Sequence, residues 1–315
     1  MSKQITSTIL MIRPVSFRMN AETAVNNYYQ KVVEGLTSEQ AQVQALAEFD
    51  NFVDVLRAHD IKVIVVDDTN DPETPDSIFP NNWISFHHDG SIALYPMYAE
   101  NRRPERRSDI KDILAEQGFS VERIRDFTSF ESVAKYLEGT GSMLLDRDNH
   151  IVYAAISGRT DEEVLNAFCE EFSYKAVPFR ANQTVNGERL PIYHTNVMMC
   201  VTDMLAIVCL ASIDDADEKA AVVSSFQSTG KQIIDISEEQ VNHFAGNMLA
   251  LTNPQGEKFL VMSAAALQSL NDDQLAIINA HYEIVSSAID TIEALGGGSA
   301  RCMMAEIFLP KTQDN

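Results

Sequence analysis

One pattern recurs along this chain: an apolar segment, a polar turn, a second apolar segment and then a stretch with helical periodicity. It occurs five times, with a period of roughly 50 to 60 residues. Asp89-Gly90 and the segment 253–256 are typical hairpin turns. A repeat of this length predicts one supersecondary unit that packs against copies of itself. The last apolar segment, 301–309, has no partner after it, so we expect it to pair with 8–12 and close a ring.

The periodicity of apolar residues places the expected elements. A helix is predicted over 38–59, with Ser38 at its N-terminus. Its expected apolar face consists of Val43, Leu46, Ala47, Phe49, Val53 and Leu56. The other elements are assigned in the same way. Strands are expected at 8–12, 61–66, 83–86, 92–95, 142–145, 151–155, 197–201, 205–210, 248–251, 259–262 and 301–309, and helices at 108–117, 161–172, 217–227 and from the end of the strand 259–262 to about 281.

Composition narrows the class of protein. The 315 residues are 45% hydrophobic, enough for a large core, and no linker divides them, so we expect a single α/β domain over 1–315. The formal charge of −22 disfavours binding to nucleic acid or anionic membranes. Neither a secretory signal nor a membrane span is expected. The four cysteines form no CxxC pair, which favours a reducing cytoplasm.

Five polar residues share one position in the repeat, just before each hairpin. Their spacings are 56, 56, 53 and 55 residues, and in a ring of equivalent units they would converge on the axis: Asn82, Glu138, His194, Asn247 and Cys302. A thiol, an imidazole and a carboxylate are the groups that covalent thiol catalysis needs. Each could instead be an ordinary turn or core residue. His87 and His88 lie outside this register, and no metal site is expected there.

The glycine-rich segment 295–304 carries the candidate nucleophile. Three consecutive glycines precede Arg301 and Cys302, and an apolar segment follows. A cysteine that is partly exposed beside a cation has a lowered thiol pKa, so Arg301 favours Cys302 as a nucleophile. The alternative is a buried core cysteine in a C-terminal strand. The remaining cysteines lie within predicted elements and are assigned to the core: Cys169, Cys200 and Cys209.

Four segments together resemble a known superfamily. They are Gly-Gly-Gly-Ser-Ala-Arg-Cys-Met at 296–303, Glu-Gly-Thr-Gly at 138–141, His194 with Asn196, and Ser-Gly-Arg-Thr at 157–160. They resemble the guanidino-group modifying enzymes, which include arginine deiminase, dimethylarginine dimethylaminohydrolase, agmatine deiminase and the amidinotransferases. The resemblance covers residues 13–310 and is greatest to the arginine deiminase-related proteins assigned to citrulline utilisation. It implies a five-bladed α/β-propeller (pentein) of ββαβ units.

The resemblance also implies roles for individual residues. Arg159 would hold the α-carboxylate of the substrate, and the positions of Asn82 and Asn196 would contact its planar group. Arginine deiminases have aspartates at these two positions, and their Glu-Gly-Gly-Asp segment ends in an acid where this chain has Gly141. Asp76 is the nearest remaining carboxylate. The residues expected to contact substrate are therefore Asn82, Asn196, Asp76, Arg159, Asn247 and Asn81.

These observations predict a cytoplasmic C–N hydrolase that needs no cofactor and no metal. Cys302 would attack the planar carbon of a guanidino or ureido group, His194 would transfer protons, and Glu138 would orient the imidazole. The partner would be a small amino acid, with citrulline favoured because amides suit a neutral group. Arginine, agmatine and methylated arginines stay open as substrates, as do group transfer, a silent binding protein and a homo-oligomer.

Overall fold

The computed structural model describes residues 4–312. Residues 1–3 and 313–315, the two ends of the expected domain, lie outside the described residues. Within the described residues, five three-stranded sheets and one separate hairpin form a mixed α/β fold. The sheets are β17-β1-β2, β3-β4-β5, β6-β7-β8, β11-β12-β13 and β14-β15-β16.

The strands have the following bounds: β1 Thr8–Arg13, β2 Lys62–Asp67, β3 Ile84–Phe86, β4 Ser91–Leu94, β5 Arg123–Asp126, β6 Leu144–Asp146, β7 Ile151–Ala155, β8 Lys175–Phe179, β9 Asn182–Val185, β10 Glu188–Pro191, β11 Met199–Val201, β12 Leu205–Val208, β13 Gln232–Asp235, β14 Leu249–Thr252, β15 Lys258–Ser263, β16 Glu283–Ser287 and β17 Ala305–Glu306. The α-helices are α1 Ala21–Ala24, α2 Ser38–Ala58, α3 Ile110–Glu116, α4 Gly139–Ser142, α5 Glu162–Phe172, α6 Thr195–Met198, α7 Ala216–Ser228, α8 Glu238–Asn242, α9 Ala264–Ser269, α10 Asp272–Asn279 and α11 Asp290–Gly296. Short 3-10 helices add η1 Pro80–Asn82, η2 Glu100–Glu105, η3 Thr128–Val133, η4 Leu210–Ser212 and η5 Ala300–Met303.

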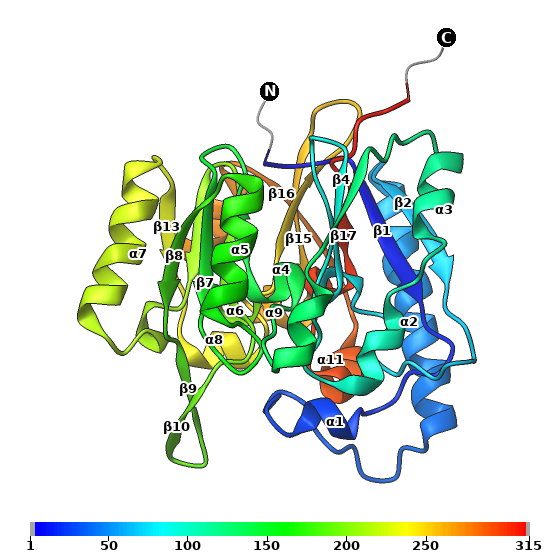
Figure 1. The fold of residues 1–315 in the computed structure, drawn as a ribbon. Helices are drawn as coiled ribbons and strands as arrows, with labels where there is room; N and C mark the ends of the chain where they lie inside the picture. Colours follow the sequence, from blue (N-terminus) through cyan, green and yellow to red (C-terminus); the bar gives the residue numbers. More distant parts are fainter. Residues whose placement is uncertain (1–3, 313–315) are drawn as a thin grey trace.

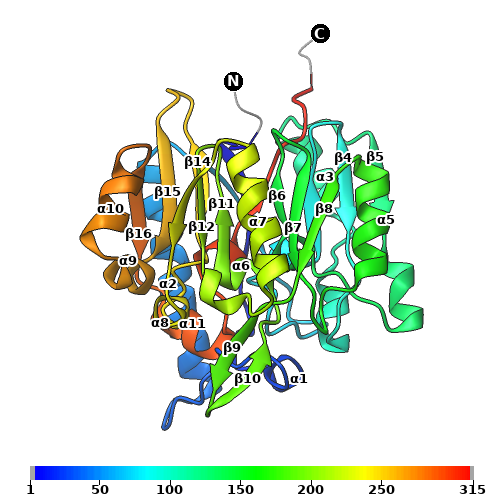
Figure 2. The same cartoon turned by 90° about the vertical axis from the view of Figure 1, so that its left-hand side faces the viewer.

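Each sheet has the same construction. Its middle strand pairs antiparallel with one neighbour and parallel with the other. A parallel pair needs a crossover connection, and helices supply it: α2, α3, α5, α7 and the α9–α10 pair. Figures 1 and 2 show these helices on the outside of the molecule, with the sheets between them.

The two ends of the chain meet in one sheet. Residues Ile9 and Leu10 of β1 pair with Glu306 and Ala305 of β17, as the sequence predicts for the first and last strands. Neighbouring sheets also touch through their first strands, since β17 lies beside β3, β6 beside β11, and β11 beside β14. The isolated bridge between Thr6 and Leu251 ties the start of the described chain to β14. The five sheets therefore remain separate ladders that pack side by side.

Several local expectations differ from the structure. The helix 38–59 is capped by Thr37, whose side chain accepts from the Gln40 N–H while Gln40 returns a bond to the Thr37 backbone. Of the expected apolar face, Phe49, Val53 and Leu56 are buried, whereas Val43 is exposed, and Ala45 and Phe52 are buried as well.

The other differences concern the C-terminal half. The expected strand 301–309 is mostly irregular, because the 3-10 turn η5 takes up its first residues and only Ala305 and Glu306 form β17. The single helix expected up to about residue 281 is two helices, because Asn271 begins a new capping box with Gln274. The hairpin β9–β10 was not expected; it projects from the lower edge in Figure 1.

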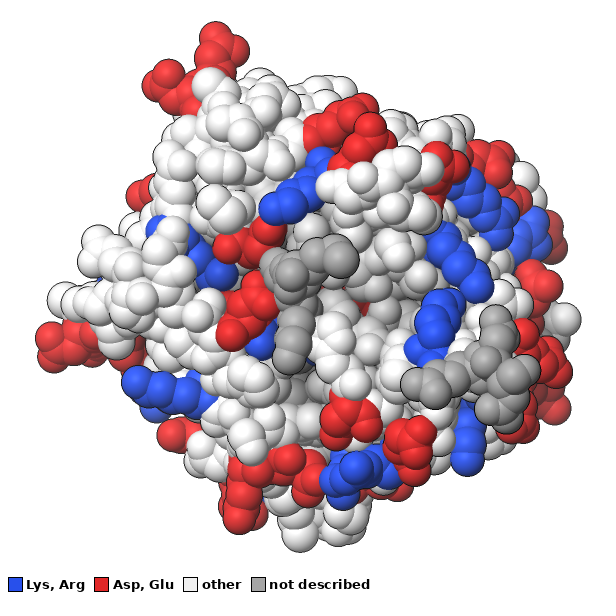
Figure 3. Space-filling view, turned by 90° about the horizontal axis from the view of Figure 1, so that it is seen from above, with Lys and Arg blue, Asp and Glu red and all other residues white. Residues whose placement is uncertain are grey.

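The surface reflects the acidic composition. Seen from above the view of Figure 1 (Figure 3), acidic side chains are spread around the whole outline, with lysines and arginines among them. Among the described residues, no helix combines the length and apolar character needed to cross a bilayer.

Candidate active site

The five polar residues of the shared register lie at one end of the first strands of the sheets. Asn82 ends the turn η1 before β3, and Glu138 and His194 are the residues before the short helices α4 and α6. Asn247 lies two residues before β14, and Cys302 is in η5 before β17. The repeat therefore delivers each side chain to the same end of the molecule, where a short turn aims it toward the others.

The thiol of Cys302 is buried and faces two amides. Its residue is 3% exposed, and its Sγ accepts hydrogen bonds from the Nδ2 atoms of Asn196 and Asn247, each at 3.3 Å. Asn247 also accepts from the Arg301 backbone N–H at 2.9 Å, which fixes the nucleophile turn. Two amide N–H groups from other parts of the chain therefore point at the sulfur of the candidate nucleophile.

The expectation that Arg301 acts as the cation beside the Cys302 thiol is wrong. Its guanidinium donates to the Met304 carbonyl at 2.8 Å and to the Glu306 carboxylate at 2.8 Å, so its charge is paired within its own segment. The expectation that Cys302 is partly exposed is also wrong. Chain neighbours of a cysteine are not necessarily its spatial neighbours, and here amides from two other sheets take the place of the cation.

His194 and Glu138 form a buried pair. The His194 Nε2 lies 2.7 Å from Glu138 Oε2, while the Tyr98 backbone N–H donates to Oε1 at 2.9 Å. Burial opposes ionisation of Glu138, but the charge of Arg159 and the bond to His194 outweigh it and lower the pKa of the carboxyl. Burial lowers the pKa of His194 to about 4, against the opposing effect of Glu138. At neutral pH the site therefore holds a neutral imidazole beside an ionised carboxylate.

Because Gly141 has no side chain, the side chains of Asn82 and His194 can lie directly against it. A Cβ at this position would lie 2.5 Å from Asn82 Nδ2 and 2.9 Å from His194 Nδ1. The acid that ends the corresponding segment in arginine deiminases therefore has no room here while these two side chains keep their positions.

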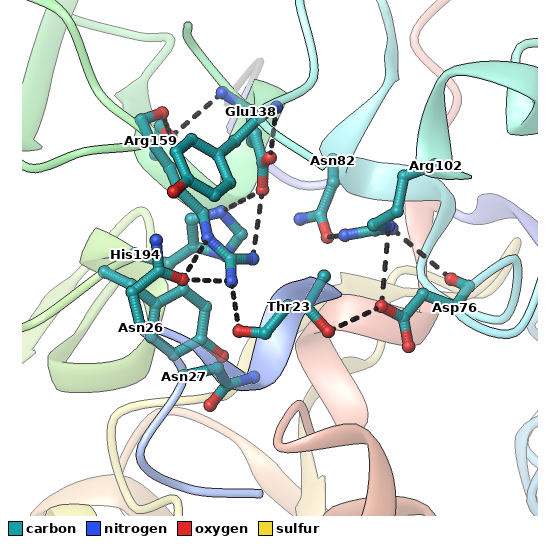
Figure 4. A network of polar contacts seen from close by, with 12 residues as sticks. Thr23, Asn26, Asn27, Asp76, Asn82, Arg102, Glu138, Arg159 and His194 are labelled. Atoms are coloured by element: carbon teal, nitrogen blue, oxygen red, sulfur yellow. Dashed lines mark hydrogen bonds and ion pairs between the residues drawn. The ribbon is translucent and has the colours of Figure 1, made fainter. Parts of the chain in front are cut away.

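Arg102 fixes the orientation of the Asn82 amide. Its Nη1 donates to Asn82 Oδ1 at 2.8 Å, and its other nitrogens form a two-point pair with Glu105 at 2.8 and 2.9 Å. Burial opposes the charge of Arg102, but Glu105 outweighs it and raises the pKa of the guanidinium. Arginine only donates, so the oxygen of Asn82 must face Arg102 and its NH2 group must face away. Figure 4 shows the Asn82 nitrogen on the side away from Arg102. One N–H of this NH2 group donates to Asn81 Oδ1 at 3.0 Å, and the other is left for the site.

Asp76 carries an acceptor without a partner. Its Oδ2 accepts from Asn20 Nδ2 at 2.8 Å and from Thr23 Oγ1 at 3.1 Å, and Arg102 Nε lies 3.8 Å away. Its Oδ1 is buried and has no hydrogen-bond partner in the described residues, and the same is true of Asn196 Oδ1. Unpaired buried acceptors are costly, so both oxygens are candidates for contact with ligand N–H groups.

Arg159 is another charged residue that lines the site. Its guanidinium is 3.5 Å from Glu138 Oε2, donates from Nε to Asn26 Oδ1 at 2.9 Å and from Nη2 to the Thr23 carbonyl at 2.9 Å (Figure 4). The cavity shared by Cys302, His194, Asn82, Asp76 and Arg159 has a volume of only about 10 Å³, room for roughly one water. One wall of it is the segment around α1. A larger ligand therefore requires this wall to move.

The sequence as a whole matches one family model. That model is described as N,N dimethylarginine dimethylhydrolase, eukaryotic, and it matches residues 13–309. The chain belongs to this family. No curated protein matches the chain significantly.

Solved structures of three proteins show a similar fold. The N-terminal domain of ArgZ, covalently bound to a reaction intermediate, is 17% identical with a TM-score of 0.70, covering 96% of this chain and 99% of that one. Full-length ArgZ, an arginine dihydrolase from the ornithine-ammonia cycle in cyanobacteria, is 16% identical with a TM-score of 0.71; the match covers 96% of this chain and 41% of that one. A dimethylarginine dimethylaminohydrolase adduct with S-methyl-L-thiocitrulline is 12% identical with a TM-score of 0.63, covering 96% and 100%. At these identities the likeness establishes the fold.

In this family member, all nine residues selected from the sequence fall in one cluster. Five of them line the cavity, and the other four are hydrogen-bonded to a residue that does. Asn196 and Asn247 bond to Cys302. Glu138 bonds to His194, and Asn81 bonds to Asn82. Sequence reasoning missed Arg102 and its partner Glu105, because the segment 100–105 holds two arginines with nothing to distinguish them. It also missed the segment that supplies Thr23, Asn26 and Asn27. Among residues 4–312, no group of three or more His, Cys, Asp or Glu side chains could hold a metal ion.

Proposed function

We propose that this protein is a cysteine-dependent hydrolase that cleaves a C–N bond in the ureido or guanidino group of an arginine-related amino acid. One observation carries the proposal: a thiol held by two amides and an imidazole–carboxylate pair lie around one buried cavity. Membership in the dimethylarginine dimethylhydrolase family supports the reaction class. The five sheets would form the blades of a single α/β-propeller domain.

The proposed reaction uses Cys302, His194 and Glu138 in turn. The neutral imidazole of His194 takes the thiol proton as the sulfur attacks the planar carbon. It then gives that proton to the departing nitrogen, which leaves a covalent thio-intermediate. Water, activated by the same imidazole, cleaves the C–S bond and restores the thiol. Glu138 holds the imidazole in position and stabilises its positive charge.

The orientation of Asn82 favours a ureido group. A ureido group offers one carbonyl acceptor beside its N–H donors, whereas a guanidinium offers donors only. Asn82 presents an N–H because Arg102 occupies its oxygen, and Asn196 Oδ1 is an acceptor without a partner. One donor and one acceptor match a ureido group. We therefore favour citrulline, whose hydrolysis gives ornithine, carbon dioxide and ammonia.

Asp76 supports a second candidate, a guanidinium substrate. Its Oδ1 is an unpaired buried acceptor on a carboxylate that lines the cavity, which suits a cation. Structures of similar fold are described with L-arginine and with ornithine and NAD+ bound to AgrE. Arginine or a methylated arginine would then be the substrate, and Arg159, once its partners in the α1 segment move, would pair with the α-carboxylate.

The deciding experiment compares kcat/KM on citrulline and on arginine, with product masses, for the natural protein and the Asn82→Asp, Asn196→Asp double variant. We expect the natural protein to prefer citrulline by tenfold or more and the double variant to shift toward arginine. A tenfold preference of the natural protein for arginine would contradict the ureido assignment. Asp76→Asn would then be the variant to test. Transfer to an added amine would indicate an amidinotransferase, and no turnover on any of these compounds would indicate a binding protein.

A further inference from the structure

A second cavity lies at the opposite end of the first strands from the thiol. Asn82 and Glu138 precede β3 and β6, whereas this cavity is built from the turns that follow these strands and from the segment between α5 and β8. Its volume is about 300 Å³, the small end of the range for ligand pockets. Six of its lining residues matter here: His87, His88, Arg147, His150, Phe172 and Tyr174.

Arg147 is unusual among the buried arginines of residues 4–312. Three others are equally buried, and each has a carboxylate within ion-pair distance: Arg102 with Glu105, Arg159 with Glu138 and Arg301 with Glu306. Arg147 is only 4% exposed, and no carboxylate of the described chain lies within that distance. Burying an unpaired guanidinium is costly, and in a chain with 46 acidic residues a partner would have been easy to supply.

The groups around Arg147 do not neutralise it. Its guanidinium carbon lies 4.0 Å from the centre of the Phe308 ring, and a phenyl ring carries no charge. The two carboxylates at the cavity are already engaged: Asp89 accepts from the backbone and hydroxyl of Ser91 at 3.0 and 2.8 Å, and Glu171 pairs with Arg125 at 2.8 Å.

The cavity wall is aromatic. The rings of His87 and Phe172 stack with their centres 4.0 Å apart, and those of His150 and Tyr174 lie 5.2 Å apart. Burial and the nearby charge of Arg147 lower the pKa of His87 well below its usual value, so this imidazole is neutral and held by Ser85 at 2.8 Å. The site thus combines one unpaired positive charge with flat, apolar surfaces.

We propose that this cavity binds a small organic anion: a carboxylate or phosphate pairs with Arg147, and the planar body to which it is attached lies against the aromatic wall. An oxyanion supplies the two acceptors that a guanidinium fork prefers. The ligand would sit near the first and last parts of the described chain, because the Arg147 backbone N–H donates to Gln4 and its guanidinium lies over Phe308. The site is separate from the thiol and independent of the reaction proposed for it.

The test measures binding of phenyl phosphate, benzoate and inorganic phosphate by calorimetry and by their effect on the melting temperature. We expect saturable binding of at least one of the two aromatic anions. Comparing the affinities for phenyl phosphate and benzoate shows whether the site prefers a phosphate or a carboxylate. Arg147→Met should weaken that binding tenfold or more. The exposed Arg180→Met should leave it unchanged.

Stability gives a second measurement. Because Arg147 lacks an acidic partner, Arg147→Met should keep or raise the melting temperature of the ligand-free protein. Arg301→Met should lower the melting temperature, because it leaves the buried Glu306 carboxylate without its ion-pair partner. If Arg147→Met instead fails to fold, Arg147→Lys must still weaken binding tenfold. The proposal is overturned if none of the three anions binds, if Arg147→Met or Arg147→Lys binds like the natural protein, or if binding is lost in Arg159→Met but not in Arg147→Met.

Discussion

Glu293 on helix α11 should make the stability of this protein depend on pH in an unusual direction. Its side chain is 6% exposed, and its Oε1 accepts from the Ser299 hydroxyl at 2.5 Å, three residues before the candidate nucleophile. Burial raises the pKa of this carboxyl from 4.5 to about 7, more than the hydrogen bonds from Ser263 and Ser299 lower it. The folded protein therefore holds a proton here that the unfolded chain releases.

The sign and size of the effect follow from this shift. An acid whose pKa is raised on folding contributes most to stability below its unfolded pKa of 4.5, and that contribution is lost as the pH rises through about 7. A rise of about 2.5 units corresponds to roughly 3 kcal/mol in the free energy of unfolding. Glu293→Gln keeps the shape and the acceptor for Ser299 but cannot ionise. The variant should match the natural protein near about pH 4 and be more stable by roughly 3 kcal/mol near about pH 9.

The assay is urea unfolding of both proteins across this pH range. His194 changes stability in the opposite direction between about 4 and 6.5, but it is present in both proteins and cancels in the difference. Glu39→Gln, on the exposed first turn of α2, is the matched control and should give a flat difference. If the difference between Glu293→Gln and the natural protein stays within about 0.5 kcal/mol from about pH 4 to about pH 9, burial does not raise the pKa of Glu293 and the reasoning fails.

Four further outcomes are expected. Cys302→Ala should abolish turnover at an unchanged melting temperature, while Cys169→Ala keeps activity; near-normal rates in the first would rule out the thiol mechanism. Deleting the first twelve residues removes most of β1, the middle strand of its sheet, and should prevent folding; unchanged melting would show that the ends need not pair. Gly141→Ala should lower kcat at least tenfold because its Cβ would collide with Asn82 and His194, and a normal rate would show that these side chains can shift. Arg102→Met should lower the free energy of unfolding by about 3–5 kcal/mol and reduce any preference for citrulline over arginine, since Glu105 loses its partner and Asn82 is free to rotate; an unchanged ratio would contradict the orienting role.

The sequence by itself determined the repeat and which polar residues gather in the candidate site. Hairpins and crossover helices depend on residues close in the chain, so alternation, turn residues and caps were enough to predict most elements of the five sheets. The equal spacing of Asn82, Glu138, His194, Asn247 and Cys302 was also visible, because equivalent positions in repeated units converge when the units pack around one centre.

Only the tertiary structure decided which partner each polar side chain has. Arg301 turns from Cys302 to Glu306, and Arg102 reaches across 20 residues to set the Asn82 amide. The wall at Thr23 closes over Arg159, which is 136 residues away in the chain. Such contacts depend on how separate sheets and loops pack, and local sequence patterns carry no information about that packing. For this reason the residue types in the site could be predicted, whereas the direction of each donor and acceptor could not.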